Sequence, residues 1–124
     1  MVYIDLNGLK KVNDKCGHQQ GGEYLCQFVQ HHIRTEDILV RVGGDEFVLG
    51  FMNLSAQEAE LRMAKIAEQV RQCAGQMQLP MEISYGIAQS KQYDSYEKMF
   101  AAADGAMYEM KKKHKQQNPA VVRL

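Results

Sequence analysis

Acidic side chains stand at two places in the sequence where a strand is expected to meet a loop. Asp5 follows the apolar, β-favouring run Val2-Tyr3-Ile4, and Asp45 and Glu46 stand in a glycine-rich turn. Clustered carboxylates repel one another unless a cation lies among them, and hard oxygen ligands suit Mg²⁺ bound together with substrate phosphates. Together, these three side chains predict metal-assisted phosphoryl chemistry.

Two glycines stand directly before Asp45 and Glu46. Gly43 and Gly44 suit a site that receives phosphates, because glycine lets the backbone take φ > 0 and approach a ligand closely. A plain β-hairpin is the alternative interpretation, since Gly-Gly-Asp turns are common and acidic residues at a turn are usually solvated. The turn by itself leaves both interpretations open.

Hydrophobic periodicity and turn residues predict the elements that would hold these side chains. In chain order they are a strand ending at Asp5, a helix from Gly21-Gly22 to Arg34, a hairpin of strands 38–42 and 47–49, a helix that begins at the capping box 55–58 and stops at Gly75, a strand 83–87, a helix from Asp94 to Met110, and a weakly signalled strand 120–122.

This order predicts an α+β fold with a ferredoxin-like βαββαβ core, followed by an additional helix and a short strand. We expect a mostly antiparallel sheet with the helices packed on one face. In such a sheet the first strand lies beside the third. Asp5 and the glycine-rich turn are therefore expected to converge at one edge of the sheet.

Composition limits the class of protein. At 124 residues the chain fits a single domain, 1–124, and its 15 basic and 15 acidic side chains cancel, which argues against binding to nucleic acid. Three cysteines, Cys16, Cys26 and Cys73, show no disulfide or zinc spacing, which favours a reducing, cytoplasmic location. No apolar run approaches the ~20 residues of a membrane span, so we expect no direct membrane insertion, although a parent protein could be membrane-anchored.

Several motifs resemble those of the GGDEF domain family. Gly43-Gly44-Asp45-Glu46-Phe47 is the signature of that family, and Asp5-Leu6-Asn7-Gly8-Leu9-Lys10-Lys11-Val12-Asn13-Asp14-x-x-Gly17-His18 looks like its first-strand motif. Further matches are Arg34-x-x-Asp37 and the run from Ala103-Asp104 to Lys111. The resemblance covers almost the whole chain. It implies the form of this fold found in nucleotidyl cyclases and polymerase palms, and it implies the activity of a diguanylate cyclase. Such an enzyme condenses two GTP into cyclic di-GMP and two pyrophosphates, by attack of a 3′-hydroxyl on the α-phosphate.

The resemblance implies a metal site and catalytic residues. In the family, the positions of Asp5 and Asp45 ligate two Mg²⁺ (or Mn²⁺) ions, with a backbone carbonyl contributed at the position of Leu6. Glu46 would help to bind metal or to deprotonate the attacking hydroxyl, and Lys10 would contact the phosphates. A version with one metal ion also stays open.

Nucleotide contacts are implied as well. The substrate-binding positions are Gly8, Leu9, Asn13, Gly43, Gly44, Lys111 and Lys115. Asn13 matches the residue that hydrogen-bonds guanine, but the usual companion aspartate falls at Gly22, unless neighbouring Glu23 substitutes for it. Lys115 stands where the family usually has arginine, whose planar fork holds phosphate in two bonds. Without the resemblance, the basic run 111–115 would be interpreted as a solvated helix end.

Arg34 and Asp37 match the inhibitory site of the family, an R-x-x-D pair that binds the product and stops the enzyme. Arginine suits this role because its guanidinium pairs with phosphate and stacks on guanine. Arg62 or Lys65 is a candidate secondary contact. The alternative is a salt bridge at a helix end, which the same spacing also allows.

One departure concerns the start of the chain, where the helix and the Asp-x-Leu-Thr motif that precede the first strand in the family are absent. We therefore expect an N-terminally truncated GGDEF domain, which would work as a homodimer with one GTP on each subunit and would belong to a parent protein with a sensory or regulatory domain. Two alternatives remain. One is a degenerate domain that senses cyclic di-GMP or GTP without turnover, and the other is a ferredoxin-like interaction domain without a nucleotide site.

Overall fold

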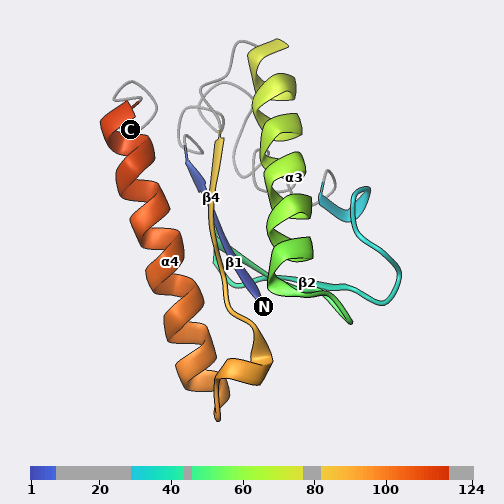
Figure 1. Ribbon diagram of the computed structural model, residues 1–124. Helices are drawn as coiled ribbons and strands as arrows, with labels where there is room; N and C mark the ends of the chain where they lie inside the picture. The colour runs from blue at the N-terminus through green and yellow to red at the C-terminus, as the bar shows by residue number, and fades with distance from the viewer. Residues whose placement is uncertain (8–28, 44–45, 77–81, 118–124) are drawn as a thin grey trace.

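The sheet is antiparallel throughout the part of the chain that the structure, a computed structural model, describes: residues 1–7, 29–43, 46–76 and 82–117. Its four strands lie in the order β2-β3-β1-β4, and two long helices pack against them (Figure 1). The elements are β1 (Val2–Asn7), β2 (Ile38–Arg41), β3 (Glu46–Gly50), α3 (Ala56–Gln76), β4 (Glu82–Ile87), the 3₁₀ turn η1 (Ser90–Gln92) and α4 (Tyr96–Gln117).

This architecture confirms the α+β prediction. The structure places β1 beside β3, as expected for a ferredoxin-like sheet, and β2 and β3 form the predicted hairpin. Of the expected helix between Gly21 and Arg34, the described part shows only residues 29–30 as helical. The expected strand at 120–122 lies outside the described residues.

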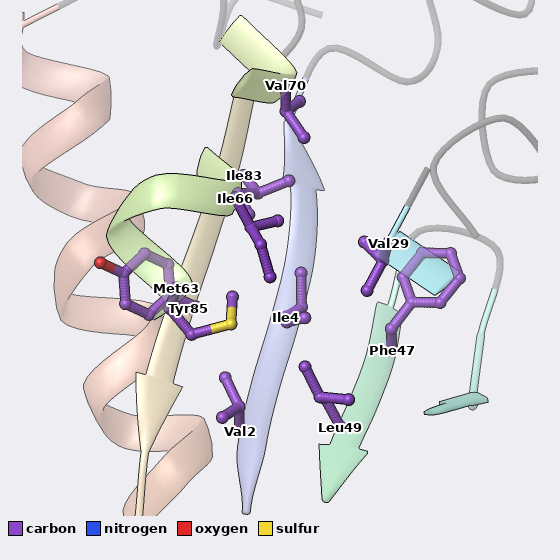
Figure 2. Close-up of a cluster of buried hydrophobic side chains, with 10 residues drawn as sticks. All are labelled: Val2, Ile4, Val29, Phe47, Leu49, Met63, Ile66, Val70, Ile83 and Tyr85. Carbon is purple, nitrogen blue, oxygen red and sulfur yellow. The ribbon is translucent and has the colours of Figure 1, made fainter. Parts of the chain in front are cut away.

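One face of the sheet is covered by α3. Buried apolar side chains of β1, β3 and β4 meet one stripe of this helix, and Figure 2 shows them filling the space between the helix and the sheet. These residues are Val2, Ile4, Phe47, Leu49, Ile83 and Tyr85 from the strands, Met63, Ile66 and Val70 from α3, and Val29. The spacing of three and four along α3 follows from 3.6 residues per turn. The main core therefore lies on this face.

The second long helix lies on the opposite face, so the expectation that the helices share one face was wrong for α4 (Figure 1). Successive side chains of a strand point to opposite faces. In β1, Val2 and Ile4 point toward α3, whereas Tyr3 packs with Met99, Ala103 and Met107 of the α4 side. Both faces of this central strand carry apolar side chains, and each face needs a helix to bury them.

Side-chain caps fix where both helices begin. The Ser55 hydroxyl accepts a hydrogen bond from the Glu58 backbone N–H at 3.1 Å, and the Glu58 carboxylate accepts one from the Ser55 N–H at 3.2 Å. This is the predicted capping box of α3. At α4, the Ser95 hydroxyl accepts from the Lys98 N–H at 3.2 Å. Neither of these helices carries an apolar stretch long enough to span a membrane.

Candidate functional site

Two of the predicted carboxylates meet at one end of the sheet. Asp5 on β1 lies directly opposite Glu46 on β3 in the antiparallel register. Side chains in such a pair share a face, with Cβ atoms about 4.5–5.5 Å apart. Asp5 is 3% exposed and Glu46 is half-buried. The predicted convergence is confirmed for these two residues, whereas Asp45 lies outside the described residues.

A cation from α4 already contacts the buried carboxylate. The Lys111 ammonium lies 2.7 Å from Oδ2 of Asp5, and the Lys111 side chain is 36% exposed. Lys112 and Lys113 are exposed. The interpretation of residues 111–115 as a solvated helix end is therefore wrong for Lys111. Its position on α4 directs this side chain toward the sheet.

Glu46 has its own hydrogen-bond donor in β1. The Tyr3 hydroxyl donates to Oε2 of Glu46 at 2.8 Å. The Tyr3 ring is held edge-on against Phe100 of α4, with ring centroids 5.2 Å apart and an angle of 85° between the planes. Burial, followed by this hydrogen bond and the negative charges nearby, raises the pKa of Tyr3. The phenol therefore stays protonated and acts as a neutral donor to a carboxylate.

The turn between β2 and β3 closes on the backbone of Glu46. The N–H groups of Val42 and Gly43 both donate to the Glu46 carbonyl oxygen, at 2.9 and 3.2 Å. Gly43 does not adopt the positive φ that the sequence suggested for the two glycines, while Gly44 lies outside the described residues. A Cβ atom at Gly43 would lie 3.7 Å from Oε2 of Glu46. Without that atom, the backbone here leaves space beside the carboxylate.

A second polar contact joins the end of α4 to the sheet. Ser84 lies opposite Asp5 in the β1–β4 register, and its hydroxyl is 2.9 Å from Nδ1 of His114. The same ring nitrogen lies 3.6 Å from Oε1 of Glu82. His114 follows Lys111 by three residues, so both side chains project from the same side of the helix. The site residues predicted from the sequence do not include His114 or Tyr3.

Arg34 and Asp37 form a closed ion pair ahead of β2. The Asp37 carboxylate, whose side chain is 0% exposed, accepts bonds from the Arg34 guanidinium at 3.3 and 3.4 Å and from the Arg34 backbone N–H at 2.9 Å. It also accepts the Met52 N–H at 3.1 Å, and the Arg34 guanidinium donates to the Met52 carbonyl. The salt bridge of the alternative interpretation is therefore present, with Arg34 still 31% exposed.

The environment of Asp37 favours its charged form. Burial alone would raise the pKa of this carboxyl, but the backbone N–H groups of Arg34 and Met52, with the Arg34 guanidinium, outweigh burial and lower the pKa. By the strand register, Ile38 pairs with Gly50 and Arg41 with Phe47. The R-x-x-D pair thus lies at the end of the hairpin that is remote from Glu46.

Several predicted site residues lie outside the described residues or have only a described backbone. Their identities come from the sequence, and the structure adds no geometry to them. They are Gly8, Leu9, Lys10, Asn13, Gly22, Glu23, Gly44 and Asp45, together with the side chains of Leu6 and Lys115. The candidate secondary contacts Arg62 and Lys65 lie on α3.

The donor set fits a hard divalent cation. Asp5 and Glu46 present carboxylate oxygens, the ligand type that Mg²⁺ prefers, and a metal ion would share the Asp5 carboxylate with the Lys111 ammonium on Oδ2. In the described ranges alone, no group of three or more His, Cys, Asp or Glu side chains is arranged to hold a metal ion.

Comparison with protein families gives one match that spans most of the chain. The family described as "Diguanylate cyclase, GGDEF domain" matches residues 1–117. Among curated proteins, diguanylate cyclase DgcS of Shewanella oneidensis is 31% identical over 114 residues, and diguanylate cyclase DosC of Escherichia coli is 28% identical over 120 residues. These alignments include 90% and 91% of the chain, which spans only 38% and 26% of the length of the two relatives.

Solved structures show the same fold. The GGDEF domain of DgcB from Caulobacter crescentus, determined in complex with c-di-GMP, superposes with a TM-score of 0.74 at 22% identity, over 90% of this chain and 71% of that one. The GGDEF domain of YfiN from Pseudomonas aeruginosa gives a TM-score of 0.68 at 27% identity, over 90% of this chain and 74% of that one.

Proposed function

Because the chain belongs to the diguanylate cyclase GGDEF domain family, we propose that it condenses two GTP molecules into cyclic di-GMP with release of two pyrophosphates. The observation that carries this proposal is the pairing of Asp5 with Glu46 across two strands, with the Lys111 ammonium on the Asp5 carboxylate. Carboxylates beside a lysine provide both metal ligands and a phosphate contact.

Each residue of the site would take one role. Asp5, Asp45, Glu46 and the Leu6 carbonyl would hold one or two Mg²⁺ or Mn²⁺ ions. Bound metal would supply charge stabilisation for the departing pyrophosphate and lower the pKa of the attacking 3′-hydroxyl. Lys111 is partly exposed, so it can also reach solvent and a nucleotide phosphate. Lys10 and Lys115 would add phosphate contacts, with Lys10 at the catalytic centre.

Catalysis would need two copies of the chain. Each site binds one GTP, with Asn13 on the guanine edge, and a two-fold dimer places the two nucleotides for reciprocal attack. The chain spans 26% to 38% of its two curated relatives, so regulation would come from further domains of a parent protein. Gly22 offers no side chain for the second guanine contact, which leaves Glu23 as the candidate substitute.

Product analysis after incubation with GTP tests this function directly. We expect the purified chain to form cyclic di-GMP and pyrophosphate with Mg²⁺ or Mn²⁺, and synthesis to stop when EDTA removes the metal and to return when excess metal is restored. Matched incubations with ATP measure base selectivity. The absence of cyclic di-GMP at high protein concentration, where a weak dimer would form, would contradict the proposed activity.

A second candidate function, binding of cyclic di-GMP, rests on Arg34 and Asp37. Their closed pair leaves part of the Arg34 guanidinium exposed, so this group can donate hydrogen bonds to a phosphate oxygen as well as to the Asp37 carboxylate. In an active enzyme such binding would cause product inhibition. In a chain without turnover it would make the domain a sensor.

Calorimetry with cyclic di-GMP tests whether Arg34 and Asp37 bind this ligand, and product analysis then separates an inhibited enzyme from a sensor. We expect Arg34→Ala to weaken binding at least about tenfold and Arg34→Lys to weaken it less, because lysine keeps the charge but loses the planar fork. Arg71→Ala, which removes an exposed arginine of α3, is the matched control and should bind as the wild type does. Equal affinity in Arg34→Ala would exclude the R-x-x-D site, and binding without synthesis by the wild type would favour the sensor.

A further inference from the structure

Tyr3 joins three elements around the candidate metal site. Its backbone belongs to β1, its hydroxyl donates to Glu46 of β3 at 2.8 Å, and its ring packs against Phe100 of α4. It stands two residues before Asp5, so the two side chains project from the same face of the strand. Nothing in the motifs assigns this tyrosine a role.

We propose that Tyr3 is a positioning residue that orients the Glu46 carboxylate toward the cation site. The inference rests on the proposed function, in which Glu46 binds metal or accepts the proton of the 3′-hydroxyl. A glutamate side chain has several rotatable bonds, and ordering it costs conformational entropy at the moment of binding. A hydrogen bond to Oε2 orders the side chain in advance and leaves Oε1 for the cation or the hydroxyl.

The chemical nature of the donor matters for this role. A lysine or arginine bound to Glu46 would offset the negative charge that attracts a divalent cation. A phenol donates a hydrogen bond without carrying charge, so the carboxylate keeps its attraction for metal.

Phe100 explains how the orientation is maintained. The edge-to-face contact fixes the Tyr3 ring, and aromatic pairs of this geometry are favourable beyond the area they bury. Phe100 lies on α4, the helix that also carries Lys111. Helix α4 therefore acts on both carboxylates. It places Lys111 against Asp5, and through Phe100 and Tyr3 it orients Glu46.

Tyr85 provides a matched control for the hydroxyl of Tyr3. Its hydroxyl donates to Oε1 of Glu60 at 3.1 Å, and it is 7% exposed, compared with 8% for Tyr3. Tyr85 lies in the core on the α3 face (Figure 2). It pairs with Ile4 in the β1–β4 register, so its side chain points to the face opposite that of Asp5. Tyr3→Phe and Tyr85→Phe each remove one oxygen and one hydrogen bond to a glutamate, and both keep the buried ring.

Metal affinity and kinetics together test the proposal. Mn²⁺ binding is measured by electron paramagnetic resonance in the presence of the α,β-methylene analogue of GTP, which cannot release pyrophosphate. We expect Tyr3→Phe to weaken Mn²⁺ binding about tenfold, and to lower kcat by a similar factor with little change in KM for GTP, the size typical of groups that orient a metal ligand. Tyr85→Phe should match the wild type in both measurements.

A double-mutant cycle shows whether Tyr3 acts through Glu46. In a Glu46→Gln background, Tyr3→Phe should cause little further loss of Mn²⁺ affinity, because the group that it orients has changed. Independent, additive losses would overturn the proposal, as would wild-type metal affinity in Tyr3→Phe, or an equal loss in Tyr85→Phe.

The role of Tyr3 and the cyclase activity can fail separately, and the measurements distinguish the two failures. A wild-type chain that binds Mn²⁺ and the analogue but makes no cyclic di-GMP would contradict the activity alone, and the metal affinities of the two tyrosine variants would still decide the role of Tyr3. A wild-type chain that binds no Mn²⁺ with the analogue would overturn both.

Discussion

Cyclic di-GMP synthesis is expected to fall by about a hundred- to a thousandfold when Asp5 is replaced by asparagine, which corresponds to ~3–4 kcal/mol of lost charge stabilisation. Asparagine keeps the volume of the side chain but removes its negative charge. Asp5 is buried, lies opposite Glu46 and contacts the Lys111 ammonium at 2.7 Å. Its charge is therefore central to both the metal site and the placement of a phosphate-binding lysine. Initial rates of product formation at saturating GTP and Mg²⁺ measure the effect.

The same variant should stay folded. Removing one partner of a fully buried ion pair costs about 3–5 kcal/mol, but Lys111 is 36% exposed and can regain water, so we expect a smaller loss in the free energy of unfolding. Asp94→Asn is the control: this carboxylate is 76% exposed, pairs with the exposed Lys98, and should be replaceable at the wild-type rate. A folded Asp5→Asn protein with more than about a tenth of wild-type activity would contradict the assignment of Asp5 to the metal site.

The convergence of Asp5 with Glu46 could be predicted because it depends on chain order. Strand, hairpin and helix signals specify the topology, and the topology places the first strand beside the third. Turn residues around Gly43 then indicate where the hairpin closes, next to Glu46. Local sequence patterns therefore contained enough information to bring together two carboxylates that stand 41 positions apart in the chain.

The hydrogen-bond partners of the site could not be found in the same way. Tyr3 stands in an apolar run that suggests only a buried strand, and its bond to Glu46 depends on how far the phenol reaches across to β3. His114 stands in a basic run, and its contact with Ser84 depends on the helical phase and on the distance of α4 from the sheet. These are tertiary facts that residue types and spacing do not contain.

The same limit applies to Arg34 and Asp37. Their spacing of three allowed an ion pair, and the ion pair is present. The third partner, the backbone of Met52 after β3, comes from a distant part of the chain. This contact satisfies the buried Asp37 carboxylate and ties the loop before β2 to the end of β3.

The face occupied by α4 was also missed, although the sequence contains a signal for it at Gly86. A glycine inside a strand often marks a close approach of another backbone. A Cβ atom at Gly86 would overlap the Ala103 carbonyl oxygen and the Met107 backbone nitrogen, and would lie 2.8 Å from the Ala106 Cβ. The helix therefore rests directly on the β4 backbone, with no side chain between them.

Replacement of Gly86 by alanine is consequently expected to have the largest effect on stability. The methyl group has no space, so α4 must move away from β4, and we expect the free energy of unfolding to fall by about 3 kcal/mol, at the upper end of the range for overpacked cores. Urea unfolding measures this loss. Gly105→Ala is the control: a Cβ atom there meets nothing within 4 Å among the described residues, and alanine favours a helix by up to about 1 kcal/mol, so this variant should be at least as stable as the wild type.

The Gly86→Ala variant also tests whether the position of α4 determines the geometry of the site. A displaced α4 would carry Lys111 away from Asp5 and His114 away from Ser84, and would loosen the Phe100 contact with Tyr3. We expect the folded fraction, stabilised at low temperature, to bind Mn²⁺ with the α,β-methylene GTP analogue more weakly than the wild type does. Wild-type metal affinity in a destabilised Gly86→Ala protein would show that the carboxylates keep their arrangement without the helix, and the control of the site by α4 would then be wrong.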